Sequence, residues 1–87
     1  YQEANKVGVS GEILINHLTE LNTIVKIEAA NRKQEASAMR QLNPDEAQKQ
    51  NSMASQLEAL SRNINDLIKN IRSYHINFIF MYKFNIS

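Results

Sequence analysis

The sequence contains no cysteine and no tryptophan, and it has only one proline and two glycines among its 87 residues. Without cysteine, a disulfide framework and a thiolate metal site are both excluded. The two glycines, Gly8 and Gly11, form no phosphate-binding loop. His17 and His75 lie far apart, and a metal site built on both would need carboxylates to complete it. Because one core stabilises so short a chain only marginally, we expect it to oligomerise.

An excess of charge of one sign is also missing. Ten basic and nine acidic residues are interspersed along the chain, for a net charge of +1. Nucleic-acid binding usually requires a basic face or stripe, so we predict no nucleic-acid partner. The chain has no polybasic anchor for a membrane surface, so a membrane ranks below other protein chains as the expected partner.

The start of the chain and its lack of cysteine bear on its location. It begins at Tyr1 rather than at methionine, so we expect a processed product or a fragment. The absence of cysteine suits an exported protein. These two features predict a location in a cell envelope or outside the cell.

The carboxylates show no catalytic arrangement. Glu12, Glu20, Glu28 and Glu35 are spaced by seven or eight residues and therefore line one side of a helix. As a metal or acid–base array they would need Glu-x-x-His partners, and the sequence has none. We expect His17, one step from an apolar stripe, to be hydrogen-bonded or exposed. The sequence predicts a non-enzymatic protein with no catalytic residue, no cofactor and no metal site.

An apolar helical stripe follows Ile13. Its large members have 4-3-4 spacing and are Leu14, Leu18, Leu21 and Val25. The same spacing continues through smaller or polar residues, namely Ala29, Arg32, Ala36 and Met39. The second half of this helix is therefore expected to bury little area. The helix starts either at Ser10, acting as an N-cap, or nearer Gln2.

The segment from Leu42 to Glu46 predicts a break between two helices. Pro44 cannot donate a backbone hydrogen bond, and it pushes Asn43 away from helical angles. Asn43 as N-cap, Pro44 at the first helical position and the acidic Asp45 and Glu46 together make a strong start signal. Glu46 can also complete a capping box. The alternative is a proline kink within one long helix.

The second helix carries the most regular periodicity. Steps of four and three join six apolar residues, namely Met53, Leu57, Leu60, Ile64, Leu67 and Ile71. Ala54 and Ile68 flank this seam, and Gln50 and Ser61 are expected on the opposite, polar face. Three heptads of apolar residues favour a coiled-coil-like partner over a broad globular core.

The composition changes after Ser73, and the remaining segment contains five of the six aromatic residues. Apolar residues occupy alternate positions, namely Ile76, Phe78, Phe80, Tyr82, Phe84 and Ile86. This period is typical of a strand, and the segment is too short to cross a bilayer as a helix. A lone strand would need a partner strand or groove. Alternatively, A/T-rich codons produced the segment by frameshift or read-through, and it carries no function.

The predicted fold is therefore all-α. Residues 1–73 form a two-helix hairpin, or part of a helical bundle, and residues 74–87 form an apolar tail that is strand-like or disordered. Packing against other protein chains, as a homo-oligomer or hetero-oligomer, is the predicted activity. The predicted interface consists of Leu14, Leu18, Leu21, Val25, Met53, Leu57, Leu60, Ile64, Leu67 and Ile71.

Residues 5–60 also resemble a known class of helical protein. Asn5, Gly11-Glu12-Ile13-Leu14 and Leu18-Thr19-Glu20-Leu21-Asn22 lead into Ala30-Asn31-Arg32-Lys33-Gln34-Glu35-Ala36. In leucine spacing and amide content this run resembles the long helix of TrbJ-type conjugal-transfer proteins and the helical minor pilins of type IV secretion systems. The resemblance implies an exported protein of the bacterial envelope, periplasm or medium that contacts apparatus subunits or recipient cells. The aromatic tail does not fit it.

Three functions remain open from the sequence. The first is a structural subunit of a bacterial secretion or conjugation apparatus, such as a pilus. The second is a phage or viral structural subunit whose hairpins bundle into a tube or stalk. The third is a secreted helical effector that binds a host protein through the seam between Met53 and Ile71.

Overall fold

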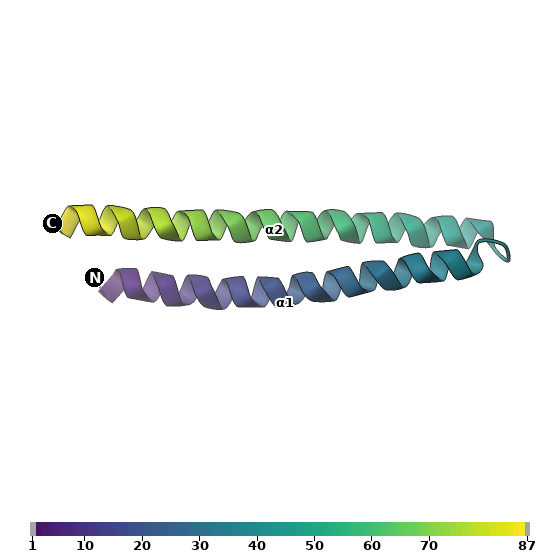
Figure 1. Cartoon of the computed structure of the whole chain (residues 1–87), viewed down its shortest axis with the longest axis horizontal. Helices are drawn as coiled ribbons and strands as arrows, with labels where there is room; N and C mark the ends of the chain where they lie inside the picture. Colours follow the sequence, from purple (N-terminus) through teal and green to yellow (C-terminus); the bar gives the residue numbers. More distant parts are fainter. Residues whose placement is uncertain (1, 87) are drawn as a thin grey trace.

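Two long helices lie side by side and antiparallel in the computed structural model of the chain (Figure 1). Helix α1 spans Gln2–Met39 and helix α2 spans Pro44–Ile86. The chain termini lie at one end of the rod and the turn lies at the other, and the Cα atoms extend 68 × 15 × 10 Å. The structure describes the backbone of residues 2–86 and the side chains of residues 10–74, 76 and 81. The predicted all-α hairpin is confirmed, and the alternative of one kinked helix is wrong.

The turn has the cap that the sequence predicted. The amide of Glu46 donates to Asn43 Oδ1 at 3.2 Å, and the amide of Ala47 donates to the Asn43 carbonyl at 3.0 Å. The first of these bonds satisfies an amide that lacks an intrahelical partner, and the second is the first intrahelical bond of α2. Pro44 occupies the first helical position, where no amide donor is required. The chain therefore reverses here for local reasons.

Two details of the helix ends differ from the sequence-based expectations. The capping box is only half formed, because the Glu46 carboxylate accepts from Gln50 Nε2 at 3.0 Å, while the amide of Asn43 donates to the Met39 carbonyl at 2.7 Å. Of the two predicted starts for α1, the structure has the one at Gln2 and not the one at Ser10. Gly8, within α1, costs about 1 kcal/mol relative to alanine, which does not break a helix of 38 residues.

The backbone after Ser73 remains helical as far as Ile86, in place of the extended conformation that the alternating pattern predicted. No proline or glycine interrupts this stretch. A helix satisfies its own backbone hydrogen bonds, whereas a single strand leaves both edges unpaired, and this outweighs the lower helix propensity of aromatic residues. The side chains at 75, 77–80 and 82–87 lie outside the described residues. Whether the tail has a function stays a prediction.

Candidate interaction surface

The seam between the helices follows a heptad repeat, whose positions we label a to g. The a positions are Ile15, Asn22, Ala29 and Ala36 in α1 and Ala47, Ala54, Ser61 and Ile68 in α2, and all eight are buried. The d positions are Leu18, Val25 and Arg32 in α1 and Gln50, Leu57, Ile64 and Ile71 in α2. Ile15, Val25, Ile64 and Ile68 form the apolar core, with Leu18, Leu57 and Ile71 packed against it. This core lies around the middle of the rod and does not reach the turn.

A polar layer interrupts the core. Asn22 is 6% exposed; its Nδ2 donates to Asn65 Oδ1 at 2.9 Å, and its Oδ1 accepts from Ser61 Oγ at 2.5 Å. Both bonds join α1 to α2, so they exist in only one axial register of the helices. A buried polar group that keeps its partners costs little, but one that loses them is expensive. This layer therefore favours the observed register over its neighbours.

A second polar cluster lies nearer the turn. Arg32 Nε donates to Glu28 Oε1 at 2.9 Å, and Arg32 Nη1 donates to Gln50 Oε1 at 3.0 Å. The Gln50 amide in turn donates to Glu46. Here the seam is filled by the stem of an arginine and by alanines rather than by large apolar side chains. The expectation that the second half of α1 buries little area is confirmed.

The structure divides the predicted interface residues into two groups. Val25 and Ile64 are buried in the seam, and Leu18, Met53, Leu57 and Ile71 are half-buried. The other four, Leu14, Leu21, Leu60 and Leu67, are 45–47% exposed and do not lie between the two helices. All four occupy g positions, one residue before an a position. The predicted stripe was thus a d and g stripe, whereas the hairpin closes on a and d.

Several seam residues were missed by the sequence analysis. Gln50 and Ser61 were expected on a solvated face, yet they are 7% and 6% exposed. Ile15 and Asn22 were not singled out, and Ile68 was treated only as a flank. All of these residues belong to one sequence pattern, in which a and d positions alternate at spacings of three and four along both helices. Many residues at these positions are small or polar, so the pattern is less visible than the leucines at g.

The exposed leucines form one side of the hairpin, which we call the leucine face and define as Leu14, Leu21, Ile24, Leu60 and Leu67. In an antiparallel pair the g positions of the two helices lie on the same side, so Leu14 and Leu21 share a side with Leu60 and Leu67. Ile24, at the neighbouring c position, is 63% exposed.

A groove confirms that this side is shared by both helices. It has a volume of about 350 Å³ and is lined by Glu28 and Arg32 of α1 and by Met53, Gln56, Leu57 and Leu60 of α2. Tyr74 and Met81 extend the α2 column at the same heptad position and are 70% and 62% exposed. Ile13 and Ile27, also more than half exposed, lie on the outer edge of α1.

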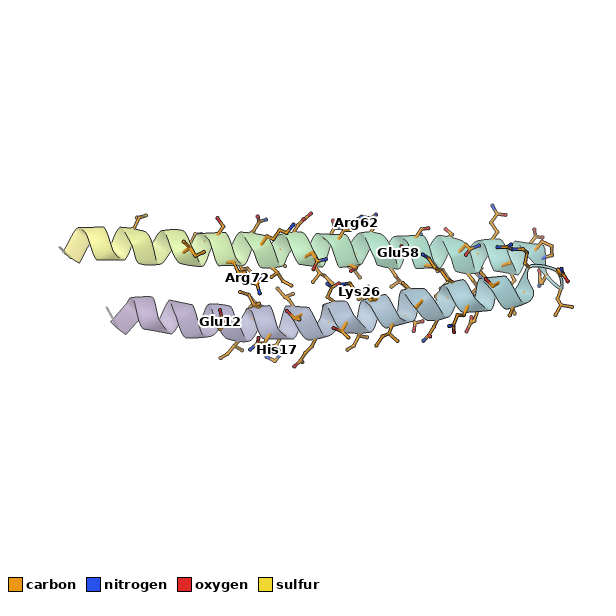
Figure 2. All side chains as sticks on the ribbon, viewed as in Figure 1. Glu12, His17, Lys26, Glu58, Arg62 and Arg72 are labelled. Carbon is orange, nitrogen blue, oxygen red and sulfur yellow. The ribbon has the colours of Figure 1, made fainter. Side chains whose placement is uncertain are left out.

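The opposite side of the hairpin is polar. Lys26, Lys33, Glu58 and Arg62 line an open groove of about 400 Å³ whose floor includes Ala29. Lys33 Nζ lies 3.0 Å from Glu58 Oε1, an exposed ion pair that contributes little to stability. Figure 2 shows Lys26 on the edge of α1 toward α2 and His17 on the edge facing away. The two sides of the hairpin thus differ sharply in chemistry.

Within the described residues, no three histidine, aspartate or glutamate side chains come together to hold a metal ion. In the same part of the chain, neither helix has a stretch long and apolar enough to cross a membrane. Comparison with known proteins found no matching family model, no matching curated protein and no matching solved structure. The surface must therefore be interpreted from its own chemistry.

Proposed function

We propose that this protein is a non-enzymatic assembly subunit that works by packing its leucine face against helices of another protein chain. The observation that carries the proposal is the exposure of Leu14, Leu21, Leu60 and Leu67, all on one side of the hairpin. Scattered single apolar residues are normal on a surface, but a contiguous column across two helices is typical of an interaction site.

The breadth of the apolar stripe supports the same function. A helix in a two-stranded coiled coil needs apolar residues only at a and d, whereas a helix in a bundle carries a third apolar position. In α2 the d positions Leu57 and Ile64 face α1, while the g positions Leu60 and Leu67 face solvent. The chain thus has the pattern of a bundle helix and closes only half of a bundle by itself.

A narrower assignment is a subunit of a bacterial conjugation or type IV secretion apparatus, located in the envelope or outside the cell. Its support is the resemblance of residues 5–60 to TrbJ-type proteins and helical minor pilins. The apolar outer edge of α1, with Ile13 and Ile27, adds a further contact surface of the kind that a subunit with several neighbours needs. That the apparatus is one of conjugation or type IV secretion is therefore a proposal.

Site-specific photo-crosslinking tests the function. A benzophenone amino acid replaces Leu60 in one protein and Ser55 in a matched control, since both side chains are exposed on α2 but Ser55 lies off the leucine face. Irradiation of the chain alone, and in extract of the cells that produce it, should give adducts with a protein chain at position 60 and none at position 55. Absence of adducts at position 60 under both conditions would refute the proposed function.

A further inference from the structure

We infer that the leucine face binds a second copy of this chain, with the two hairpins antiparallel, so that the assembly is a four-helix dimer. The inference rests on the proposed function, because it assumes that this face packs against helices, and it names the partner. Four features of the hairpin support it: the size of the face, its place along the rod, its charges and the weakness of the intrachain core.

The exposed apolar area has the size that a dimer requires. Each aliphatic member of the leucine face is 45–63% exposed, and Tyr74 and Met81, which extend the column, are 70% and 62% exposed. With on the order of 90 Å² for each aliphatic residue and more for Tyr74, the column offers about 700 Å². Stable interfaces bury about 800 Å² on each partner, whereas the largest apolar patch of a typical monomer covers about 300–600 Å². The leucine face together with Tyr74 and Met81 therefore approaches one half of a standard interface.

The position of the face makes it self-complementary. Leu60 and Leu67 lie on either side of the middle of α2, and Leu21 lies at the middle of α1. A two-fold axis through this point, perpendicular to the rod, brings the leucines of one hairpin onto those of the other at the middle of the two rods. A two-fold interface uses one patch on both subunits, and a centred patch allows this without an overhang.

The charges on this side select the antiparallel orientation. Beyond the leucines toward the turn, the g positions are Met53 and three glutamates, Glu28, Glu35 and Glu46, and of these glutamates Glu28 is the one paired with an arginine. A parallel dimer would place the unpaired glutamates of one hairpin next to those of the other, and like charges in such contacts repel. The antiparallel dimer puts the two turns at opposite ends and avoids that contact.

The seam between the two helices of one chain is too thin to stabilise the hairpin fully, so contacts with another chain are expected to add stability. Its apolar core consists of four buried residues, and the remaining layers contain alanines, Asn22, Ser61 and Gln50. Small domains that cannot build a sufficient core alone are commonly stabilised by oligomerisation. Packing two leucine faces together gives each hairpin a second apolar layer next to the first.

Sedimentation equilibrium and size-exclusion chromatography with light scattering, over a concentration series of the full chain, measure the stoichiometry. We expect a reversible transition from one chain mass to twice that mass. Leu60→Lys places two unpaired charges in the two-fold interface, one from each chain. It should raise the dimer dissociation constant at least about a hundredfold. Ser55→Lys, which adds the same charge to the same helix, should leave the constant within about threefold.

Leu21→Gln, a milder change on α1, gives a second measurement if Leu60→Lys lowers the helix content of the dilute hairpin. It should also weaken the dimer, by about tenfold. A spin label on Gln41→Cys tests the orientation, since the chain has no other cysteine. Labels at the two turns should lie tens of ångströms apart in the 68 Å rod, whereas a parallel dimer would bring them together.

Three results would overturn the inference: a monomer at every concentration, a dimer that neither Leu60→Lys nor Leu21→Gln weakens, or labelled turns that lie side by side. A monomer that still forms adducts at position 60 with a different protein would refute the second copy and leave the proposed function standing. A monomer with no adducts at position 60 would refute both.

Discussion

At the scale of single residues, Asn22 helps to fix how the two helices align. It bonds to Asn65 at 2.9 Å and to Ser61 at 2.5 Å, and both partners belong to α2. A shift of one helix by a heptad would leave the buried Asn22 amide and the Ser61 hydroxyl without each other. Polar groups of this kind are known to fix the register of coiled coils at some cost in stability. The thin seam makes such a device useful, because alanines alone would allow sliding.

Replacing Asn22 by alanine should therefore destabilise the hairpin by about 1–3 kcal/mol, because the buried hydroxyl of Ser61 loses its acceptor. Asn31→Ala is the matched control, since Asn31 is exposed on the same helix and gains the same helix propensity. Urea unfolding followed by circular dichroism, at equal protein concentration, measures both. Equal stability of the two variants would contradict the structural role of the Asn22 layer.

At the scale of the elements, the sequence allowed the helices and their break to be predicted, but not the side on which they meet. Asn43 and Pro44 act on their own neighbours, so local chemistry was enough to locate the turn. The seam depends on contacts between residues about forty positions apart, such as Asn22 with Ser61. Because a and g are adjacent positions, periodicity alone could not separate the seam from the leucine face. Because the side chains at g are larger than those at a, the sequence analysis assigned the exposed g residues to the seam.

The same difference in register gives a prediction for α2. Ile64 is 5% exposed and Leu60 is 45% exposed, although both belong to the predicted stripe. In dilute solution, where hairpins are separate, Ile64→Asp should cost at least about 3 kcal/mol, because a charge is buried without a partner. Leu60→Asp should change the stability of the separate hairpin by less than about 1 kcal/mol.

Thermal and urea unfolding of both aspartate variants at low concentration decide between the two registers. Ile64 lies at d, which belongs to both registers, so if Leu60→Asp is as damaging as Ile64→Asp when hairpins are separate, then the helices meet at d and g rather than at a and d. Ser55→Asp, on an exposed position of the same helix, shows the effect of the charge itself.

At the scale of the whole molecule, the rod has a thick middle part and a thin part toward the turn. Ile15, Val25, Ile64 and Ile68 lie around the middle of the rod, together with the leucine face. Toward the turn, the buried positions are Ala29, Ala36, Ala47, Gln50 and Ala54. Buried apolar area stabilises in proportion to its size, so each layer of the thick middle part contributes more than a layer of alanines. The short connection at the turn offsets little of this difference, because each doubling of loop length costs only about 0.6 kcal/mol.

Amide hydrogen exchange should therefore be slowest in the middle of the rod and not beside the turn. We expect the amides of residues 64–71 to exchange at least about tenfold more slowly than those of residues 47–54, since the alanine layers can open while the isoleucine core stays packed. Exchange measured by NMR on the full chain, residue by residue, gives the comparison within one helix. Equal protection along α2 would mean that the hairpin opens as one unit, and greater protection next to the turn would mean that the rest of α2 opens first. In either case the alanine layers would stabilise the chain at least as much as the large apolar core does.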